Sequence, residues 1–238
     1  MRLLFCLILF AASSPALAQR VIDVNKNDVN VTTSNFFMVV GGQPFVLAKF
    51  AKLVDGSPYF TDQWLRGNVV MNGGKEYWGL LLKLDLLDNE LHYQDKQGVE
   101  MIATSEIQKV VLFDTTIQEV FTFINSAFIS VPNSNLLKGW YQLLSEGNKA
   151  SVFKYYTKKM LETQPYNSAT IEQSIVTSPK YFVLYNSGFV TVKKTRDLAD
   201  IFSDKKKEIL QYIGKNNLSA NDDGSFISII NYYNSLKP

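Results

Sequence analysis

Alternation of apolar and polar residues is the strongest pattern in this chain, and it is clearest over residues 78–86. The alternating apolar residues are Trp78, Leu80, Leu82, Leu84 and Leu86. A period of two places these side chains on one face of a β-strand. The pattern therefore predicts a sheet strand with one strongly apolar side.

Shorter apolar runs on both sides of this strand are separated by turn residues. The runs cover residues 36–40, 45–54, 67–71, 90–94, 99–103, 107–113, 139–145, 151–160, 181–185 and 189–193. Asn72-Gly73-Gly74 and Asn186-Ser187-Gly188 are typical of hairpin turns, because Asn and Gly tolerate a positive φ. Gly41-Gly42-Gln43-Pro44 is predicted to be the turn between the first two runs. Strands joined by short turns predict an antiparallel meander.

Two segments do not follow this alternation. Residues 118–127 fit neither the strand period nor the helix period, so the pattern leaves both structures open. Residues 163–179 are polar and carry few strong signals. We therefore predict a long loop for residues 163–179.

After Lys194 the apolar period changes from two to about 3.6 residues, which is the helix period. Thr195 is predicted to cap a short helix that ends at Phe202, and Ser203 to cap a second helix that ends near Lys215. A last helix is predicted to begin at Asp222 or Asp223. Its apolar stripe consists of Phe226, Ile229, Ile230 and Tyr233. Such a stripe at i, i+3, i+4 and i+7 faces a core.

Strands followed by segregated helices predict an α+β fold. We expect an antiparallel β-meander, curled as a roll or an open barrel, with two or three C-terminal helices packed on it. The expected domains are an antiparallel β domain over residues 36–194 and a helical segment over residues 195–238. A polar N-terminal segment, residues 19–35, is expected to precede them.

Residues 1–18 have the layout of a cleavable secretory signal peptide. Arg2 supplies a positive charge, an apolar run follows it, and Ala16-Leu17-Ala18 places small residues before Gln19. This layout predicts export and a mature chain that begins near Gln19. We expect no transmembrane segment after cleavage, because the apolar run is too short to span a bilayer.

Composition removes several classes of site. The formal net charge of +2 gives no basic field that would attract nucleic acid. The single cysteine, Cys6, lies in the predicted signal peptide, so the mature chain is expected to have no disulfide and no cysteine nucleophile. With His92 as the single histidine, the common zinc ligand sets cannot form, and we expect no cofactor.

Candidate chemistry is confined to a few polar residues between 85 and 92. His92 lies between Leu91 and Tyr93 and is expected to point away from their face, as a surface histidine without a catalytic role. Asp85, Asp88 and Glu90 cluster around a predicted turn. Paired carboxylates can hydrolyse glycosides or bind calcium weakly. A plain surface turn is the favoured interpretation, since turns attract Asp and Asn.

Three further features have a structural interpretation that we favour. Asn221-Asp222-Asp223-Gly224 is expected to cap a helix, and Lys205-Lys206-Lys207 to lie on a solvated helix face. Aromatic residues gather in the strand-rich part, and core packing is favoured for them over a binding surface. These aromatic residues are Tyr59, Phe60, Trp64, Trp78, Trp140, Tyr141, Tyr155 and Tyr156.

Several short motifs resemble exported proteins of unknown function from Bacteroidota. The motifs are Gly56-Ser57-Pro58-Tyr59-Phe60, the Asp62–Gly67 stretch, Asp204-Lys-Lys-Lys-Glu208 and Asn231-Tyr232-Tyr233-Asn234. The resemblance covers most of the mature chain. It implies a bacterial protein of the periplasm, the cell surface or the secreted fraction, and it brings no catalytic residues with it.

The sequence alone therefore predicts an exported, non-enzymatic envelope protein. The expected ligand is a small apolar molecule, a glycan or a protein partner, bound on a concave aromatic face of the sheet. One alternative is a carboxylate-dependent hydrolase that uses Asp85 or Glu90. Another is a structural module whose helices dock onto a partner. No catalytic or metal-binding residue is assigned, and the ligand-binding residues are left open.

Overall fold

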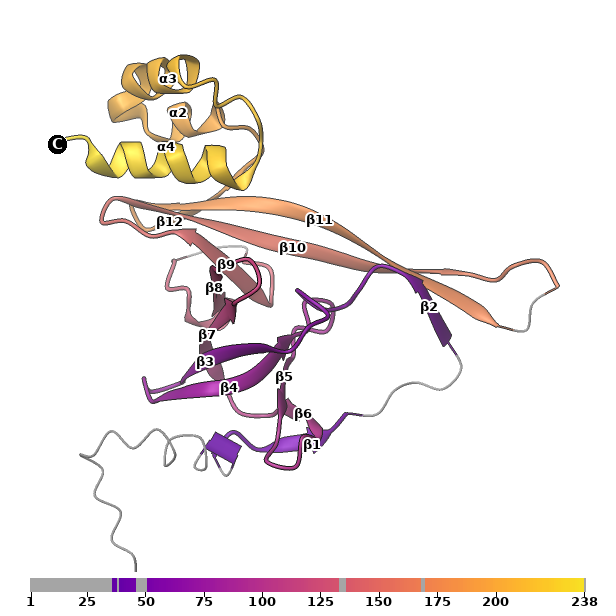
Figure 1. Ribbon diagram of the computed structural model, residues 1–238. Coiled ribbons are helices and arrows are strands. Elements are labelled where there is room, and N and C mark those ends of the chain that lie inside the picture. The colour runs from indigo at the N-terminus through magenta and orange to yellow at the C-terminus, as the bar shows by residue number, and fades with distance from the viewer. Residues whose placement is uncertain (1–35, 38, 46–50, 133–135, 168–169, 238) are drawn as a thin grey trace, which may run out of the picture.

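A computed structural model describes residues 36–37, 39–45, 51–132, 136–167 and 170–237. The predicted signal peptide and the polar segment 19–35 lie outside these residues. The described chain is an α+β fold, as predicted: a large mixed sheet that does not close into a barrel, followed by C-terminal helices (Figure 1).

Twelve strands form the sheet within the described residues. The first six are β1 (Gly42–Pro44), β2 (Ala51–Asp55), β3 (Leu65–Met71), β4 (Glu76–Leu84), β5 (Leu91–Gln94) and β6 (Glu100–Ala103). The others are β7 (Ile107–Asp114), β8 (Glu119–Asn125), β9 (Trp140–Ser145), β10 (Ala150–Thr163), β11 (Ile171–Tyr185) and β12 (Gly188–Val192). Their order is β1-β6-β5-β4-β3-β7-β8-β9-β10-β11-β12, and β2 pairs in parallel with β11. Residues 118–127, left open by the sequence, contain strand β8.

The short connection between β6 and β7 forces the sheet to curve. In the strand order β6 and β7 are four spacings apart, which is roughly 19 Å in a flat sheet. Only Thr104, Ser105 and Glu106 join them, and four Cα steps reach about 14 Å at most. The curved part, β1 and β3–β8, therefore encloses a core in which Tyr77, Leu82 and Leu112 are almost fully buried.

A bulge in β4 changes which residues of the predicted leucine strand are buried. Leu80 pairs with Gly67 and Tyr77 pairs with Val69, so Trp78 and Gly79 together oppose one residue. Gly79 has a φ of +72°, which suits a bulge because glycine lacks a Cβ. Leu80, Leu82 and Leu84 are buried as predicted, but Trp78 is 49% exposed. The prediction for Trp78 was wrong because the bulge resets the alternation.

The chain around residue 40 differs from the predicted strand and turn. Phe36, Phe37 and Val39 are helical, and the Val40 N–H donates to the Phe36 carbonyl at 2.8 Å. The Phe36 ring packs edge-on against Tyr77 at 5.2 Å, so its burial favours the helical turn. The predicted turn at residues 41–44 instead contains β1, which pairs with β6. Of the predicted strand 45–54, residues 46–50 lie outside the described residues.

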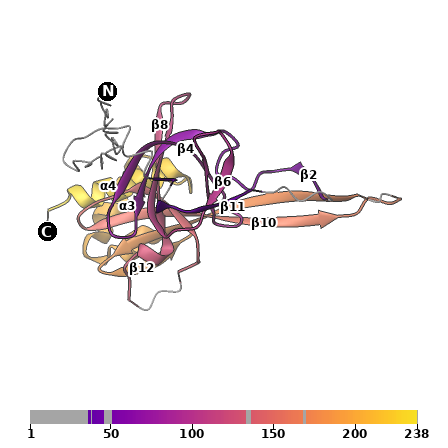
Figure 2. The ribbon, with the colours of Figure 1, turned by 90° about the horizontal axis from the view of Figure 1, so that it is seen from below.

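The predicted loop at 163–179 is wrong, because most of it is strand. β10 and β11 pair without interruption from Ala150↔Tyr185 to Thr163↔Glu172. Figures 1 and 2 show their far ends leaving the body of the protein as a long ribbon. We call residues 156–163 and 171–179 the arm. Both faces of the arm contact water over much of their length, so its sequence lacks the apolar alternation of a half-buried strand.

The C-terminal helices cover one face of β10–β12 (Figure 1). They are α2 (Asp197–Ile201), α3 (Lys206–Lys215) and α4 (Asp223–Ser235). A 3₁₀ turn, η2 (Ser203–Lys205), precedes α3. Another 3₁₀ turn, η1 (Ser126–Phe128), follows β8 in the sheet. The predicted stripe of α4 is buried against the sheet. Lys154 of β10 forms an ion pair with Asp223 at 2.8 Å, which fixes the start of α4 on the sheet.

Only one of the three predicted helix caps is correct. The Asp222 carboxylate accepts from the Ser225 N–H at 2.7 Å, as a capping residue does. Thr195 and Ser203 do not cap, since neither α2 nor α3 has a side-chain cap. Asp197 instead accepts from the N–H groups of Lys193 and Lys194 and fastens the chain before α2.

No helix within the described residues combines the length and the apolar character needed to cross a bilayer.

Candidate functional site

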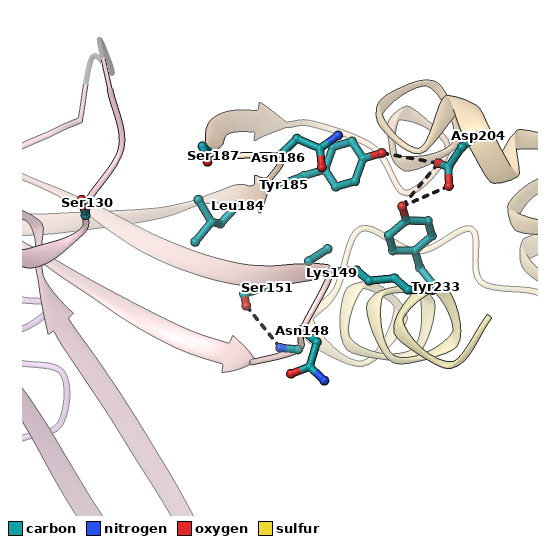
Figure 3. A pocket seen from close by; sticks show the side chains of 12 residues that line it. Ser130, Asn148, Lys149, Ser151, Leu184, Tyr185, Asn186, Ser187, Asp204 and Tyr233 are labelled. Carbon is teal, nitrogen blue, oxygen red and sulfur yellow. Dashed lines mark hydrogen bonds between the residues drawn. The ribbon is translucent and has the colours of Figure 1, made fainter. Parts of the chain in front are cut away.

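A cavity of about 620 Å³ lies at one end of the sheet, where two hairpin turns meet the helices (Figure 3). The β9–β10 turn contributes Asn148 and Lys149, and the β11–β12 turn contributes Asn186 and Ser187. Asp204, from the turn before α3, lines the opposite wall. The cavity is therefore formed by segments that are far apart in the sequence, and its lining is mainly polar.

Two tyrosines converge on the carboxylate of Asp204. Tyr233 of α4 donates to it at 3.3 Å, and Tyr185 at the end of β11 donates to it at 3.5 Å. Burial raises the pKa of Tyr233, and the nearby Asp204 charge raises it further. Tyr233 therefore stays a neutral hydrogen-bond donor throughout the physiological pH range.

The β9–β10 turn is held rigidly against α4. The Asn234 side chain accepts from the N–H groups of Lys149 and Ala150 and donates to the Ala150 carbonyl at 2.9 Å. The Lys149 ammonium donates to the Leu236 carbonyl at the end of α4. These contacts fix the backbone of the turn and leave the Asn148 side chain, which belongs to the lining of the cavity, exposed to solvent.

The β11–β12 turn has the backbone that its sequence predicts. Asn186 and Ser187 have φ values of +46° and +61°, so both central residues are left-handed. Such a turn matches the twist of a hairpin. It presents two short polar side chains at the mouth of the cavity.

His92 is not the surface histidine that the sequence predicts. It points away from the face of Leu91 and Tyr93 as expected, yet it is only 1% exposed. Tyr59 and Phe45 cover its ring at centroid distances of 5.5 and 5.0 Å. Nδ1 contacts the Glu100 carboxylate at 2.7 Å, whereas Nε2 is 3.7 Å from Glu90. A substrate has no access to a ring buried in this way.

Asp85 and Glu90, the carboxylates of the hydrolase alternative, lie together but have structural partners. Asp85 accepts from the N–H groups of Leu87 and Asp88, each at 2.8 Å, and so closes the turn before β5. Burial raises its pKa. Asp88 is exposed on the same turn. The favoured turn interpretation of this cluster agrees with these contacts.

The concave face of the curved sheet is filled by side chains of the protein itself. Phe60 packs against Phe121, Phe123 and Tyr156 at centroid distances of 4.8 to 5.9 Å. Most of the aromatic residues singled out in the sequence belong to such clusters. The Lys83 ammonium lies 4.6 Å from the ring centroid of Tyr59 and 4.6 Å from that of Trp64. Core packing is confirmed for Phe60, Trp140 and Tyr141.

No group of three or more His, Cys, Asp or Glu among the described residues is arranged to hold a metal ion. Comparisons with family models, with curated proteins and with solved structures give no match for this chain.

Sequence reasoning did not single out the cavity. The pattern predicts a turn between the runs 139–145 and 151–160, the hairpin turn at Asn186-Ser187-Gly188 and the Asp204 motif, but nothing in the sequence indicates that the three meet. The visible signal is that each turn carries Asn beside Ser or Lys, in a region otherwise rich in apolar residues.

Proposed function

We propose that this protein is an exported, non-enzymatic binding protein, and that its end cavity takes a neutral, hydroxyl-rich ligand such as a glycan. The observation that carries the proposal is the convergence of two polar turns and the Tyr185–Asp204–Tyr233 cluster on one cavity of about 620 Å³. Ligand sites are commonly of this size.

The chemistry of the lining favours hydroxyl groups over apolar ligands. Asn148 and Asn186 each offer both donors and an acceptor, and Ser187 offers a hydroxyl. These side chains can exchange hydrogen bonds with the donors and acceptors of a sugar. An apolar ligand would desolvate the same groups without replacing their bonds, which costs free energy.

The charges of the lining favour a neutral ligand. Lys149 and Asp204 are the charged residues of the lining, and their formal charges cancel. Lys149 is bonded to the Leu236 carbonyl, and Asp204 accepts from two tyrosines. Both charged groups therefore have partners within the protein, and their opposite signs give the cavity no net charge that would favour an anion or a cation.

Calorimetric titration with maltotriose, cellotriose and chitotriose tests the proposal. Asn148→Ala is expected to weaken binding of the oligosaccharide that binds by about tenfold, the effect of one or two lost hydrogen bonds. Asn186→Gly is expected to act similarly, because glycine keeps the left-handed turn. Gln211→Ala, on an exposed position of α3, is the matched control and should leave binding unchanged. Equal affinities for all three variants would refute the assignment of the cavity.

A further inference from the structure

The arm has an unpaired strand edge. β9 pairs with β10 only as far as Tyr141↔Tyr155. The opposite edge of β10 pairs with β11 along its whole length, and β2 extends the sheet beyond β11. Among the described residues no strand lies beside β10 from Tyr156 to Thr163, and Figure 2 shows this edge of the arm open. Open edges are templates for another strand.

Exposed apolar side chains accompany this edge. Met160 is 43% exposed and Leu161 is 50% exposed, on opposite faces of β10. Val176 lies diagonally across the ladder from Leu161 and is also exposed. The arm has two strands except where β2 adds a third beside residues 171–174, and so narrow a ribbon with apolar groups on both faces is marginally stable by itself in water. The edge and its side chains therefore favour coverage by a further strand.

The sequence of this edge is complementary to itself. In an antiparallel pairing centred on Met160, Lys158 lies opposite Glu162 of a second copy, and Glu162 lies opposite its Lys158. Opposite charges facing each other across a ladder are stabilising, and like charges are destabilising. Centring the pair on Lys159 would instead set two lysines face to face. The charges thus select one register.

The side chains of Lys158 and Glu162 each keep a free hydrogen-bonding position for the contact with the second copy. The Lys158 ammonium has three donors and uses two of them on the Ser57 and Tyr59 carbonyls. One oxygen of Glu162 accepts from the Gln173 amide at 2.8 Å, which leaves the other oxygen for a lysine.

We propose that the protein forms a two-fold dimer in which the open edge of β10 pairs antiparallel with the same edge of a second copy. The contact is self-complementary, as a two-fold interface requires. Because the arm projects from the body, the two bodies lie at opposite ends of a continuous sheet (Figure 1).

Cross-linking at the two-fold centre tests the register. In the full chain with Cys6→Ser, Met160→Cys places two thiols opposite each other, within reach of a disulfide. Mild oxidation should convert most of the protein to a covalent dimer. Ile117→Cys, in the turn between β7 and β8 and 57% exposed, is the matched control and should form no covalent dimer. Equal rates of cross-linking for the two variants would overturn the proposal.

Charge reversal tests the pairing without a cross-link. Glu162→Lys sets lysine against Lys158 at two symmetric places, so the dimer dissociation constant should rise by about tenfold or more. Glu119→Lys, an exposed reversal on β8, should leave it unchanged. Sedimentation equilibrium gives both constants. A wild-type protein that is monomeric at every concentration, or a dimer that Glu162→Lys leaves intact, would contradict the proposal.

Discussion

The Lys158 ammonium donates to the Ser57 carbonyl at 2.7 Å and so joins the arm to the curved sheet. A second bond goes to the Tyr59 carbonyl at 2.9 Å. The segment around these carbonyls is itself fixed to the end of β4, since the Phe60 N–H donates to the Leu84 carbonyl. The Gly56–Phe60 motif is therefore the anchor of the arm.

Lys158→Met is expected to loosen the arm. Two hydrogen bonds from a charged group are lost, so the free energy of unfolding should fall by about 1–2 kcal/mol. Hydrogen exchange of amides 157–163 and 172–178 should accelerate. Lys159→Met, exposed on the opposite face, is the control and should change stability by less than about 0.5 kcal/mol. Unchanged exchange in Lys158→Met would show that this anchor is unimportant.

Gly56 is expected to tolerate no side chain. Its φ is +75°, and a Cβ would lie 2.1 Å from the Ile175 carbonyl oxygen of the arm. Gly73 also has a positive φ, +95°, but no atom lies within 4 Å of its Cβ position. Gly73→Ala should cost about 1–2 kcal/mol of conformational strain, and Gly56→Ala about 1–3 kcal/mol more from the clash. Urea denaturation of both variants measures the difference, and equal costs would contradict the packing of this loop.

Asp85→Asn tests the turn role of this carboxylate. Burial raises the pKa of Asp85 in the folded state above its usual 3.8. At a pH between the unfolded pKa and the raised folded pKa, the folded state therefore binds more protons than the unfolded state. This group therefore lowers stability as pH rises through that window. Asp85→Asn keeps an acceptor for the Leu87 and Asp88 N–H groups and should remove this slope. Asp85→Ala should be less stable than Asp85→Asn by about 1–2 kcal/mol, measured by denaturation from acid to neutral pH.

Alkaline titration tests the burial of two tyrosines. Burial raises the pKa of Tyr59 and of Tyr141 to about 12, whereas an unfolded tyrosine titrates at 10.0. Between these values the unfolded state loses protons that the folded state keeps, so stability should fall as pH rises from 10 to 12. Tyr141→Phe should reduce this slope. Near-ultraviolet absorbance should show a late tyrosinate fraction, and a single midpoint near 10 in folded protein would contradict the prediction.

The fold class follows from the sequence because most strands alternate and most turns carry Asn or Gly. The curvature also follows, once the pairing of β3 with β7 is known, from the three-residue link after β6. The arm does not follow, because residues 171–179 have water on both faces and so carry no apolar period. The bulge at Gly79 is not predicted either, since a glycine in a strand does not by itself indicate the register of the residues that follow it.

The candidate cavity could not be predicted because it depends on contacts between distant turns. Asn234 holds the β9–β10 turn at α4 across more than eighty residues of sequence. His92 was misplaced for a similar reason. The two rings that cover it, Phe45 and Tyr59, come from segments more than thirty residues away in the sequence.

Backbone NMR during oligosaccharide titration tests the proposed function most directly. With a bound neutral oligosaccharide, the shifted amides should be those of residues 147–151 and 186–188, with Asp204 and Tyr233. Shifts that gather at His92 or along the arm, or none with maltotriose, cellotriose and chitotriose, would contradict the account.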